Sequence, residues 1–253
     1  MATACRSGHK GMSALQGWSY AHRGLHGQSV PENSLEAFRR AVNAGYGIEL
    51  DVHLLADGQL AVVHDSNLKR VTGFDVCIED LCAKDLKNYY LEDSNQTIPL
   101  LSEVLTLCAG KIPLIVELKC VRNNYEALCA AACQMLDNYG GSYCIESFDP
   151  RCIFWLRKHR PDIIRGQLTE NYFASDGATL PFYLKFILRH QLLNFLIYPD
   201  FVAYRFSDRK TLSNFFVRKI WRAVGITWTI KDINEYQRAV NEGWIPIFES
   251  FTP

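Results

Sequence analysis

Three short segments between residues 22 and 65 of this chain supply two histidines, an arginine and two closely spaced acids. The segments are His22-Arg23-Gly24, Glu49-Leu50-Asp51 and His64-Asp65. Imidazole can accept or donate a proton near neutral pH, carboxylates hold hard cations, and a guanidinium binds phosphate oxygens through a fork of N–H donors. These are the groups that metal-assisted hydrolysis of a phosphodiester requires.

The two acids Glu49 and Asp51 lie in an apolar run, residues 47–52, that has strand character. Side chains alternate along a strand, so both carboxylates point to the same side. Inside a sheet they would repel each other and lose their water, and a cation is the simplest compensation. The alternative is an exposed edge strand with two solvated acids, whose apolar residues form the buried face. The flanking histidines favour the metal site.

A third carboxylate, Glu117, lies in a second strand-like run at residues 112–119 and shares a face with Lys119. Three carboxylates without paired thiolates or clustered imidazoles suit a cation that prefers oxygen ligands, which is Mg²⁺ or Ca²⁺ rather than zinc. An ion pair between Glu117 and Lys119 at the strand end is the alternative. Metal ligation is favoured because Glu49 and Asp51 already need a partner.

Several motifs, in order and with the appropriate spacing, resemble the glycerophosphodiester phosphodiesterase family. The similarity runs from about His22 to the C-terminus. The motifs of the first half are His22-Arg23-Gly24, Pro31-Glu32-Asn33-Ser34, Glu49-x-Asp51, Asp57-Gly58, His64-Asp65 and Glu117-x-Lys119. Later fragments are Ser147-Phe148-Asp149-Pro150, Gly166-Gln167-Leu168 and Trp228-Thr229.

The resemblance implies a (β/α)₈ barrel whose site lies at the C-terminal ends of the strands. It implies that His22 and His64 are the acid–base pair. It also implies one divalent cation, Mg²⁺ or Ca²⁺, held by three carboxylates: Glu49, Asp51 and Glu117. Arg23 would bind phosphate oxygens, and Lys119 would be a second contact.

For other residues in or near these motifs, the sequence predicts a role less specifically. Glu32 could touch the metal shell or the glycerol of a substrate. Asn33 or Ser34 is expected to cap the following helix, with Asn33 favoured. Trp228, at a strand end, could form an apolar wall for glycerol or simply fill the core. His26, in a loop four residues after His22, is expected to face solvent.

The chain departs from the family pattern at two places. Leu55 stands where many members have Thr shortly before the Asp-Gly turn. Phe248-Glu249-Ser250 stands where many end on Thr-Asp after the last strand. Neither change removes a proposed ligand or histidine, but the second alters the rim near strand eight.

The pattern of strands and helices alternates, which predicts a parallel sheet with right-handed crossovers. Polar residues at the ends of several strands favour a closed barrel over an open sheet. The expected strands are residues 19–23, 47–53, 113–119, 143–148, 163–168, 200–204, 226–230 and 245–248. The expected helices are 34–44, 101–109, 124–138, 150–159, 180–196, 209–224 and 233–241.

Length and composition fit one domain of this kind. The chain has 253 residues, of which 48% are hydrophobic. We expect a partly flexible lead-in at 1–17 and a single barrel at 18–253, with a small lid-like insertion at about 67–97. Residues 180–198, rich in Leu and Phe, are too short and too charged for a good membrane span. We expect them to form an outer helix packed on the barrel, with at most peripheral membrane contact.

The charge and the cysteines of the chain indicate which kinds of partner and which cellular compartment to expect. The formal net charge is zero, which argues against nucleic acid as a partner. The nine cysteines form no Cys-x-x-Cys pair, so we expect reduced, mostly buried thiols. With no apolar leader segment visible, the sequence favours a cytoplasmic location.

The favoured function at this stage is metal-dependent hydrolysis of glycerophosphodiesters, which are deacylated phospholipids, to glycerol 3-phosphate and an alcohol. The partner would then be a small molecule. One rival is a barrel phospholipase of the D or C type that acts on intact lipid, which the aromatic segment at 180–198 keeps open. A second rival is a non-catalytic phosphodiester-binding protein, against which the intact histidines and acids argue.

Overall fold

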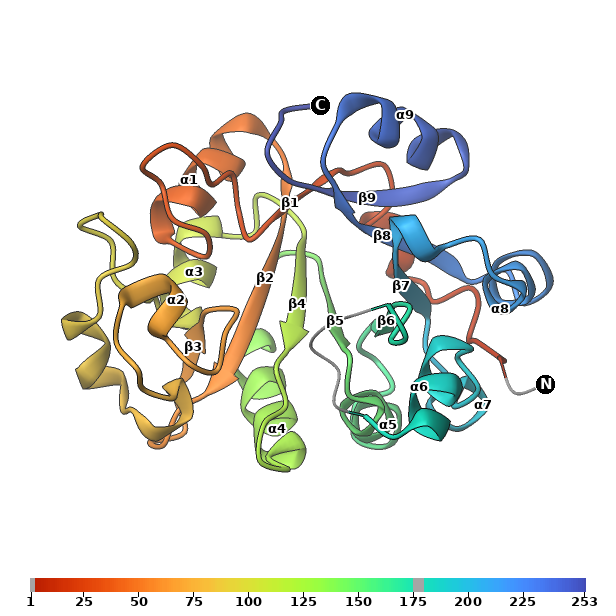
Figure 1. Ribbon diagram of the computed structural model, residues 1–253, viewed down its shortest axis with the longest axis horizontal. Coiled ribbons are helices and arrows are strands. Elements are labelled where there is room, and N and C mark those ends of the chain that lie inside the picture. Colours follow the sequence, from red (N-terminus) through yellow and green to blue (C-terminus); the bar gives the residue numbers. More distant parts are fainter. Residues whose placement is uncertain (1–2, 175–179) are drawn as a thin grey trace.

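The computed structural model describes residues 3–174 and 180–253 (Figure 1). Eight parallel strands pair in the order β1-β9-β8-β7-β6-β5-β4-β2, and the pairing of β1 with β2 closes the barrel. This confirms the predicted (β/α)₈ architecture, and each strand overlaps a predicted segment. The strands are β1 Tyr20–His22, β2 Gly47–Leu54, β4 Leu114–Leu118, β5 Tyr143–Ser147, β6 Arg165–Thr169, β7 Phe201–Arg205, β8 Val224–Ile230 and β9 Trp244–Phe248.

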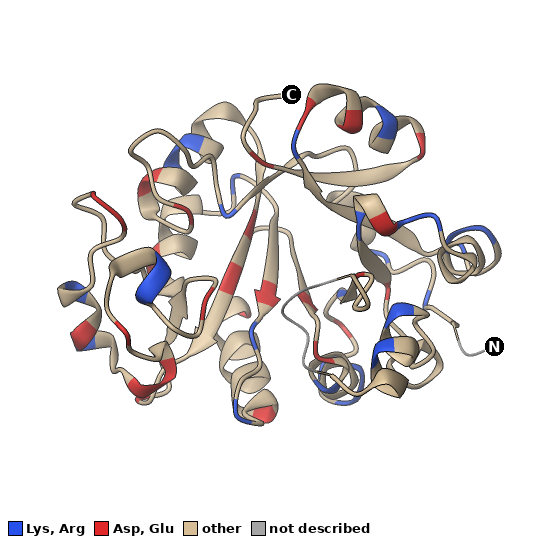
Figure 2. Cartoon of the chain, viewed as in Figure 1, with Lys and Arg blue, Asp and Glu red and all other residues tan. Residues whose placement is uncertain are grey.

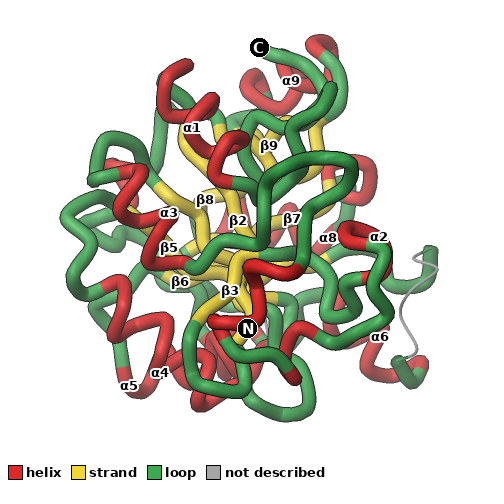
Figure 3. Tube along the Cα trace, turned by 90° about the vertical axis from the view of Figure 1, so that its left-hand side faces the viewer, coloured by secondary structure: helices red, strands yellow, loops and turns green. Residues whose placement is uncertain are grey.

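Helices surround the strands, which occupy the centre of the molecule (Figure 3). They are α1 Leu35–Ala44, α3 Leu101–Cys108, α4 Tyr125–Leu136, α5 Pro150–His159, α6 Phe182–Arg189, α7 Asn194–Ile197, α8 Leu212–Phe215 and α9 Ile233–Asn241. None of the described helices is long and apolar enough to cross a bilayer. Side-chain caps start several of them, as for Asp149 before α5 and Asp232 before α9.

Strand alternation divides the barrel into an outer apolar layer and a mixed interior. Leu50 and Val116 belong to the apolar cluster that also includes residues of the surrounding helices. Tyr20, Ile115 and Cys144 belong to a second buried cluster, inside the barrel and before the C-terminal ends of the strands. Two residues further along each of those strands, at the C-terminal end, the interior position carries a polar group. The fold therefore collects its polar side chains at one end of the barrel.

The insertion after β2 is a small unit with its own apolar cluster. Strand β3, Leu60–Val62, pairs antiparallel with β2, and the short helices α2 Lys69–Thr72, η2 Ile78–Asp80 and η3 Ala83–Asn88 follow. Its buried residues include Leu68, Val71, Ile78 and Leu86. The sequence did not predict β3, because three residues are too few to give a periodic signal.

Two of the predicted outer helices are wrong in extent. The helix expected at 180–196 breaks into α6 and α7, because Gln191 between them adopts a left-handed φ of 55°. No residue of α6 is buried, whereas Gln191, Asn194 and Ile197 are, so the predicted packing on the barrel holds for the α7 end of this segment. The helix expected at 209–224 starts at Leu212, where Thr211 caps it, and ends in a π-helical turn, η5, Phe216–Ile220.

The N-terminal segment contacts the barrel through a few buried side chains. It contains a short helix η1, Met12–Ala14, and a fully buried Leu15. Arg6 forms an ion pair with Asp200, just before β7. All nine cysteines are free thiols, six of them buried, as the sequence predicted.

Candidate active site

Three carboxylates converge inside the barrel, as the strand pattern predicted. Strands β2 and β4 are neighbours, and their register places Asp51 opposite Glu117. Oxygens of Glu49, Asp51 and Glu117 lie within 4.8 Å of one another, and all three residues are buried. A donor set of carboxylate oxygens alone fits a hard divalent cation.

Burial and neighbouring charges shift the pKa values of these three carboxyl groups in different directions. Loss of solvent and the nearby charge of Asp51 raise the pKa of Glu49 well above its ordinary value. Burial also raises the pKa of Glu117. For Asp51, burial opposes ionisation, but Lys119 and Arg23 outweigh it and hold the pKa well below the ordinary value. The amine of Lys119 lies 2.9 Å from Asp51 Oδ1 and 2.6 Å from Glu117 Oε1. The two basic side chains leave negative charge that a divalent cation would compensate.

The loop after β1 wraps around the carboxylates. Arg23 has a left-handed φ of 55°, and its backbone N–H donates to Glu49 Oε2 at 3.2 Å. Its guanidinium donates to Glu32 at 2.8 Å, with Nε 3.3 Å from Asp51 Oδ2. Glu32 also accepts a hydrogen bond from Arg70 at 2.6 Å, so it bridges two arginines.

Of the two cap candidates predicted from sequence, Asn33 does not cap α1. Ser34 is the cap, and its hydroxyl accepts from the N–H of Ala37. The Asn33 side chain, 2% exposed, instead donates to Asp51 Oδ2 at 2.8 Å. The left-handed φ of 54° at Asn33 turns it inward, which composition alone does not reveal.

His22, at the end of β1, is held by an acid that the sequence analysis treated only as a departure from the family pattern. Its Nδ1 lies 2.6 Å from Oε2 of Glu249, the residue that follows β9, and its Nε2 lies 3.9 Å from Glu49 Oε2. The hydrogen bond from His22 lowers the pKa of Glu249 to about 2. The position of an acid directly after the eighth barrel strand was the available signal.

His64 follows β3 and is fixed by a neighbouring acid as well. Its Nδ1 lies 2.6 Å from Asp65 Oδ1. Its backbone carbonyl accepts from Nε2 of the buried His53 at 3.1 Å, and the other ring nitrogen of His53 lies 2.6 Å from Glu79. The insertion thus supplies groups that orient His64, and the sequence analysis assigned no role to Asp65, His53 or Glu79.

Both histidines line one small cavity of about 90 Å³. It also contains a buried acid without a sequence-based role, Glu146, which pairs in register with Glu117 and whose Oε2 has no partner among the described residues. Trp228 packs edge-on against Phe148, with ring centroids 5.6 Å apart. The cavity is lined by His22, Arg23, Glu49, His64, Glu117, Lys119, Glu146, Phe148, Leu168, Trp228, Thr229 and Ile247.

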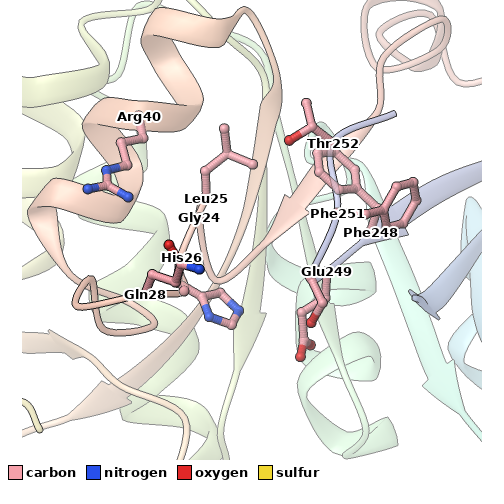
Figure 4. A pocket seen from close by; sticks show the side chains of 11 residues that line it. Gly24, Leu25, His26, Gln28, Arg40, Phe248, Glu249, Phe251 and Thr252 are labelled. Carbon is pink, nitrogen blue, oxygen red and sulfur yellow. The ribbon is translucent and has the colours of Figure 1, made fainter. Parts of the chain in front are cut away.

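Two wider hollows flank this cavity. One, of about 390 Å³, shares His64 and Lys119 with it. The other, of about 520 Å³, lies beyond the His22–Glu249 pair, and Figure 4 shows His26 and Glu249 on facing walls. His26 is half-buried rather than solvent-facing, and its Nε2 is buried without a partner among the described residues.

Comparison with known proteins identifies the family of the chain. A sequence model of the glycerophosphoryl diester phosphodiesterase family matches residues 22–202. The chain belongs to this family. The match spans β1 to β7 and includes every candidate site residue predicted from sequence except Trp228. The Trp228-Thr229 motif in β8 and the departure from the family pattern after β9 lie beyond the match.

Two curated relatives and one solved structure illustrate the family likeness. A glycerophosphodiester phosphodiesterase from Bacillus altitudinis is 39% identical over 113 residues, 42% of this chain and 46% of that protein. Human lysophospholipase D is 38% identical over 117 residues, 41% of this chain and 36% of that protein. The chain thus matches less than half the length of either relative.

The solved structure extends the likeness of fold to nearly the whole chain. It is a phosphodiesterase from Oleispira antarctica in complex with the product sn-glycerol-3-phosphate. The structural match covers 96% of this chain and 95% of the Oleispira antarctica chain, with a TM-score of 0.77 and 23% sequence identity. The likeness of fold therefore extends over β8 and β9, which carry Trp228 and lead into Glu249.

Proposed function

We propose that this protein hydrolyses glycerophosphodiesters to glycerol 3-phosphate and an alcohol. The observation that carries the proposal is the shared cavity. Two histidines, each held by an acid through Nδ1, line the same cavity as Glu49 and Glu117 of the carboxylate cluster. Membership of the family supports the same chemistry. A non-catalytic binding protein would need neither oriented imidazole.

The oxygen ligands of Glu49, Asp51 and Glu117 fit one divalent cation, Mg²⁺ or Ca²⁺. Such a cation would neutralise phosphate charge and acidify a hydroxyl group. Arg23 and Lys119 line the cavity beside it and would bind the remaining phosphate oxygens. Glu32 would act indirectly, by fixing the guanidinium of Arg23. Trp228 would form the apolar wall against the glycerol carbons.

The two histidines would move the protons. With Nδ1 held by Glu249 or Asp65, each ring keeps Nε2 for transfer. One imidazole would remove the proton from the glycerol 2-hydroxyl as its oxygen bonds to phosphorus. The other would protonate the alkoxide as the bond from phosphorus to the alcohol breaks. Water would then open the cyclic phosphate to glycerol 3-phosphate, with the histidines exchanging roles.

An assay with glycerophosphocholine, in buffer containing Mg²⁺ or Ca²⁺ and in buffer containing excess chelator, tests the proposal. We expect choline and glycerol 3-phosphate only when a cation is present. The matched control is the Asp57→Asn variant, which changes an exposed acid in the turn between β2 and β3. This variant should keep the activity of the wild type. Failure of the wild type to release choline with either ion would refute the proposed activity.

A lipid substrate is the second candidate, and the exposed aromatic residues of α6 favour it. A lysophospholipid keeps the free hydroxyl that the proposed attack needs, whereas a diacyl lipid does not. The cytoplasm is the proposed compartment, because nine free cysteines fit a reducing environment.

A further inference from the structure

One side of the barrel exposes an unusual amount of apolar side chain. Eleven of the fifteen exposed large hydrophobic residues in the described ranges lie between Phe173 and Ile220. Phe182 is 75% exposed and Leu212 is 78% exposed. We call this set the aromatic face: Phe173, Phe182, Tyr183, Phe186, Phe195, Leu196, Tyr198, Leu212, Phe215, Phe216 and Ile220.

The face is built from helices that present apolar side chains outward. Helix α6 has no buried residue, although its sequence, Phe-Tyr-Leu-Lys-Phe-Ile-Leu-Arg, is mostly apolar. In Figure 1, α6, α7 and α8 lie together on the right, across the barrel from the insertion. Ordinary monomers scatter single exposed apolar residues, whereas a contiguous set marks an interaction surface.

The same segment carries a local positive charge on a chain that is neutral overall. Residues 180–222 contain eight Lys or Arg and only two Asp. One of these acids, Asp200, is buried and paired with Arg6. Figure 2 shows the basic positions on α6 and around α8. The basic residues are Lys185, Arg189, Arg205, Arg209, Lys210, Arg218, Lys219 and Arg222.

The α6 part of the aromatic face lies at the end of the barrel that carries the candidate site, whereas Phe195, Leu196 and Tyr198 lie just before β7, at the opposite end. Thr169, the last residue of β6, donates to the carbonyl of Leu188 in α6 at 3.0 Å. From the cavity wall, Phe148 packs on Tyr172 with centroids 6.5 Å apart. The next residue, Phe173, packs on Phe182 at 5.2 Å. Aromatic side chains therefore connect the cavity wall to the exposed face.

We propose that the aromatic face docks on the surface of an anionic phospholipid bilayer through α6 and the start of α8, which lie at the candidate-site end of the barrel. Aromatic rings partition into the interfacial region, and Lys and Arg beside them contact anionic head groups. Both features occur on this one face, whereas an acidic protein partner would not require so many exposed rings. The docking is independent of the hydrolysis proposed above.

Co-sedimentation with vesicles tests the docking directly. One set of vesicles is pure phosphatidylcholine, and the other contains about 30% phosphatidylserine. We expect the wild type to sediment with the anionic vesicles and to dissociate in high salt. The double variant Phe182→Ser/Leu212→Ser should bind about tenfold more weakly, since it removes two exposed apolar side chains. The charge variant Lys185→Glu/Lys219→Glu should also lose binding to anionic vesicles.

Matched controls lie outside the face. Val240→Ser, on α9 at 46% exposure, and Lys111→Glu, in the turn before β4, should bind like the wild type. Circular dichroism confirms folding of each variant. Equal binding by wild type and both double variants would overturn the proposal. So would a wild-type dimer that the Phe182→Ser/Leu212→Ser change makes monomeric without any vesicle binding, because the face would then belong to a second copy of the chain.

Discussion

Each histidine of the candidate site depends on one acid, and Glu249 is the more informative of the two. Its carboxylate lies 2.6 Å from His22 Nδ1, and it would fix the ring with Nε2 toward the carboxylate cluster. We predict that Glu249→Gln lowers kcat on glycerophosphocholine by about 10²-fold or more, because the amide permits the wrong tautomer. KM should change little. A kcat within twofold of wild type, roughly the scatter of such measurements, would reduce Glu249 to a surface contact.

The histidines themselves should act as a unit. We expect His22→Ala or His64→Ala to lower turnover by about 10²–10⁴, which is the usual contribution of a positioned acid or base. The double variant should lose less than the product of the two losses. Turnover of purified variants, with thermal melting to check the fold, gives the answer. His9→Ala, far from the cavity, is the control, and near-normal rates for either single site variant would remove that histidine from the proposed chemistry.

The carboxylate cluster makes a prediction about metal binding that does not need an activity assay. Burial raises the pKa of Glu49, so an amide is a good substitute in the metal-free protein. We expect Glu49→Gln to melt at or above the wild-type temperature in chelator. Added Mg²⁺ or Ca²⁺ should stabilise the wild type by about 2.7 kcal/mol at a hundred times Kd and stabilise the variant much less. Equal stabilisation of both proteins would contradict ligation by Glu49.

At the scale of elements, the sequence predicts the strands well because their patterns are strong. Runs such as Ile-Pro-Leu-Ile-Val-Glu-Leu-Lys are apolar on the outer face and polar at one interior position, so both the strand and its inward acid could be inferred. Helices with a clear cap, such as α5 after Asp149, start where predicted. The break at Gln191 and the inward turn of Asn33 depend on left-handed backbone that residue type alone does not specify.

The carboxylate cluster could be predicted because strand alternation directs each acid inward, whereas the acids that hold the two histidines were not predicted. Glu49 and Asp51 are two residues apart, so their shared direction follows from local geometry. Glu249 reaches His22 across 227 residues, and Glu79 reaches His53 from the insertion. Such pairs arise only when the barrel closes and the insertion folds back.

The insertion is predicted to hold His64 through the buried His53–Glu79 pair. Glu79 accepts from His53 at 2.6 Å and from the hydroxyl of Ser66 at 2.7 Å. Glu79→Ala would leave Nδ1 of the buried His53 without its acceptor, which costs about 1–3 kcal/mol of unfolding free energy. Because His53 also binds the His64 carbonyl, turnover should fall as well. Denaturant unfolding measures the first effect, and the exposed Glu103→Ala change is a comparison that should leave turnover intact.

For the whole molecule, the decisive question is which substrate the barrel selects. The cavity beside the histidines is only about 90 Å³, which suits a phosphate and part of a glycerol. Attack by the glycerol 2-hydroxyl gains from proximity, which can contribute several kcal/mol. Esterification blocks that hydroxyl in diacyl phosphatidylcholine. Hence we predict rapid hydrolysis of glycerophosphocholine and slow hydrolysis of both the diacyl lipid and an analogue that lacks the 2-hydroxyl.

Parallel assays on these three substrates and on lysophosphatidylcholine in vesicles separate the possibilities at the scale of the whole protein. If the aromatic face brings the cavity to a bilayer, the lysophospholipid should be cleaved, and the Phe182→Ser/Leu212→Ser change should slow its cleavage. The same change should leave the hydrolysis of soluble glycerophosphocholine unaltered. Equal rates on diacyl lipid would exclude attack by the 2-hydroxyl and favour a phospholipase. Equal rates on the deoxy analogue, with intact lipid still resistant, would instead leave direct attack by water as the route.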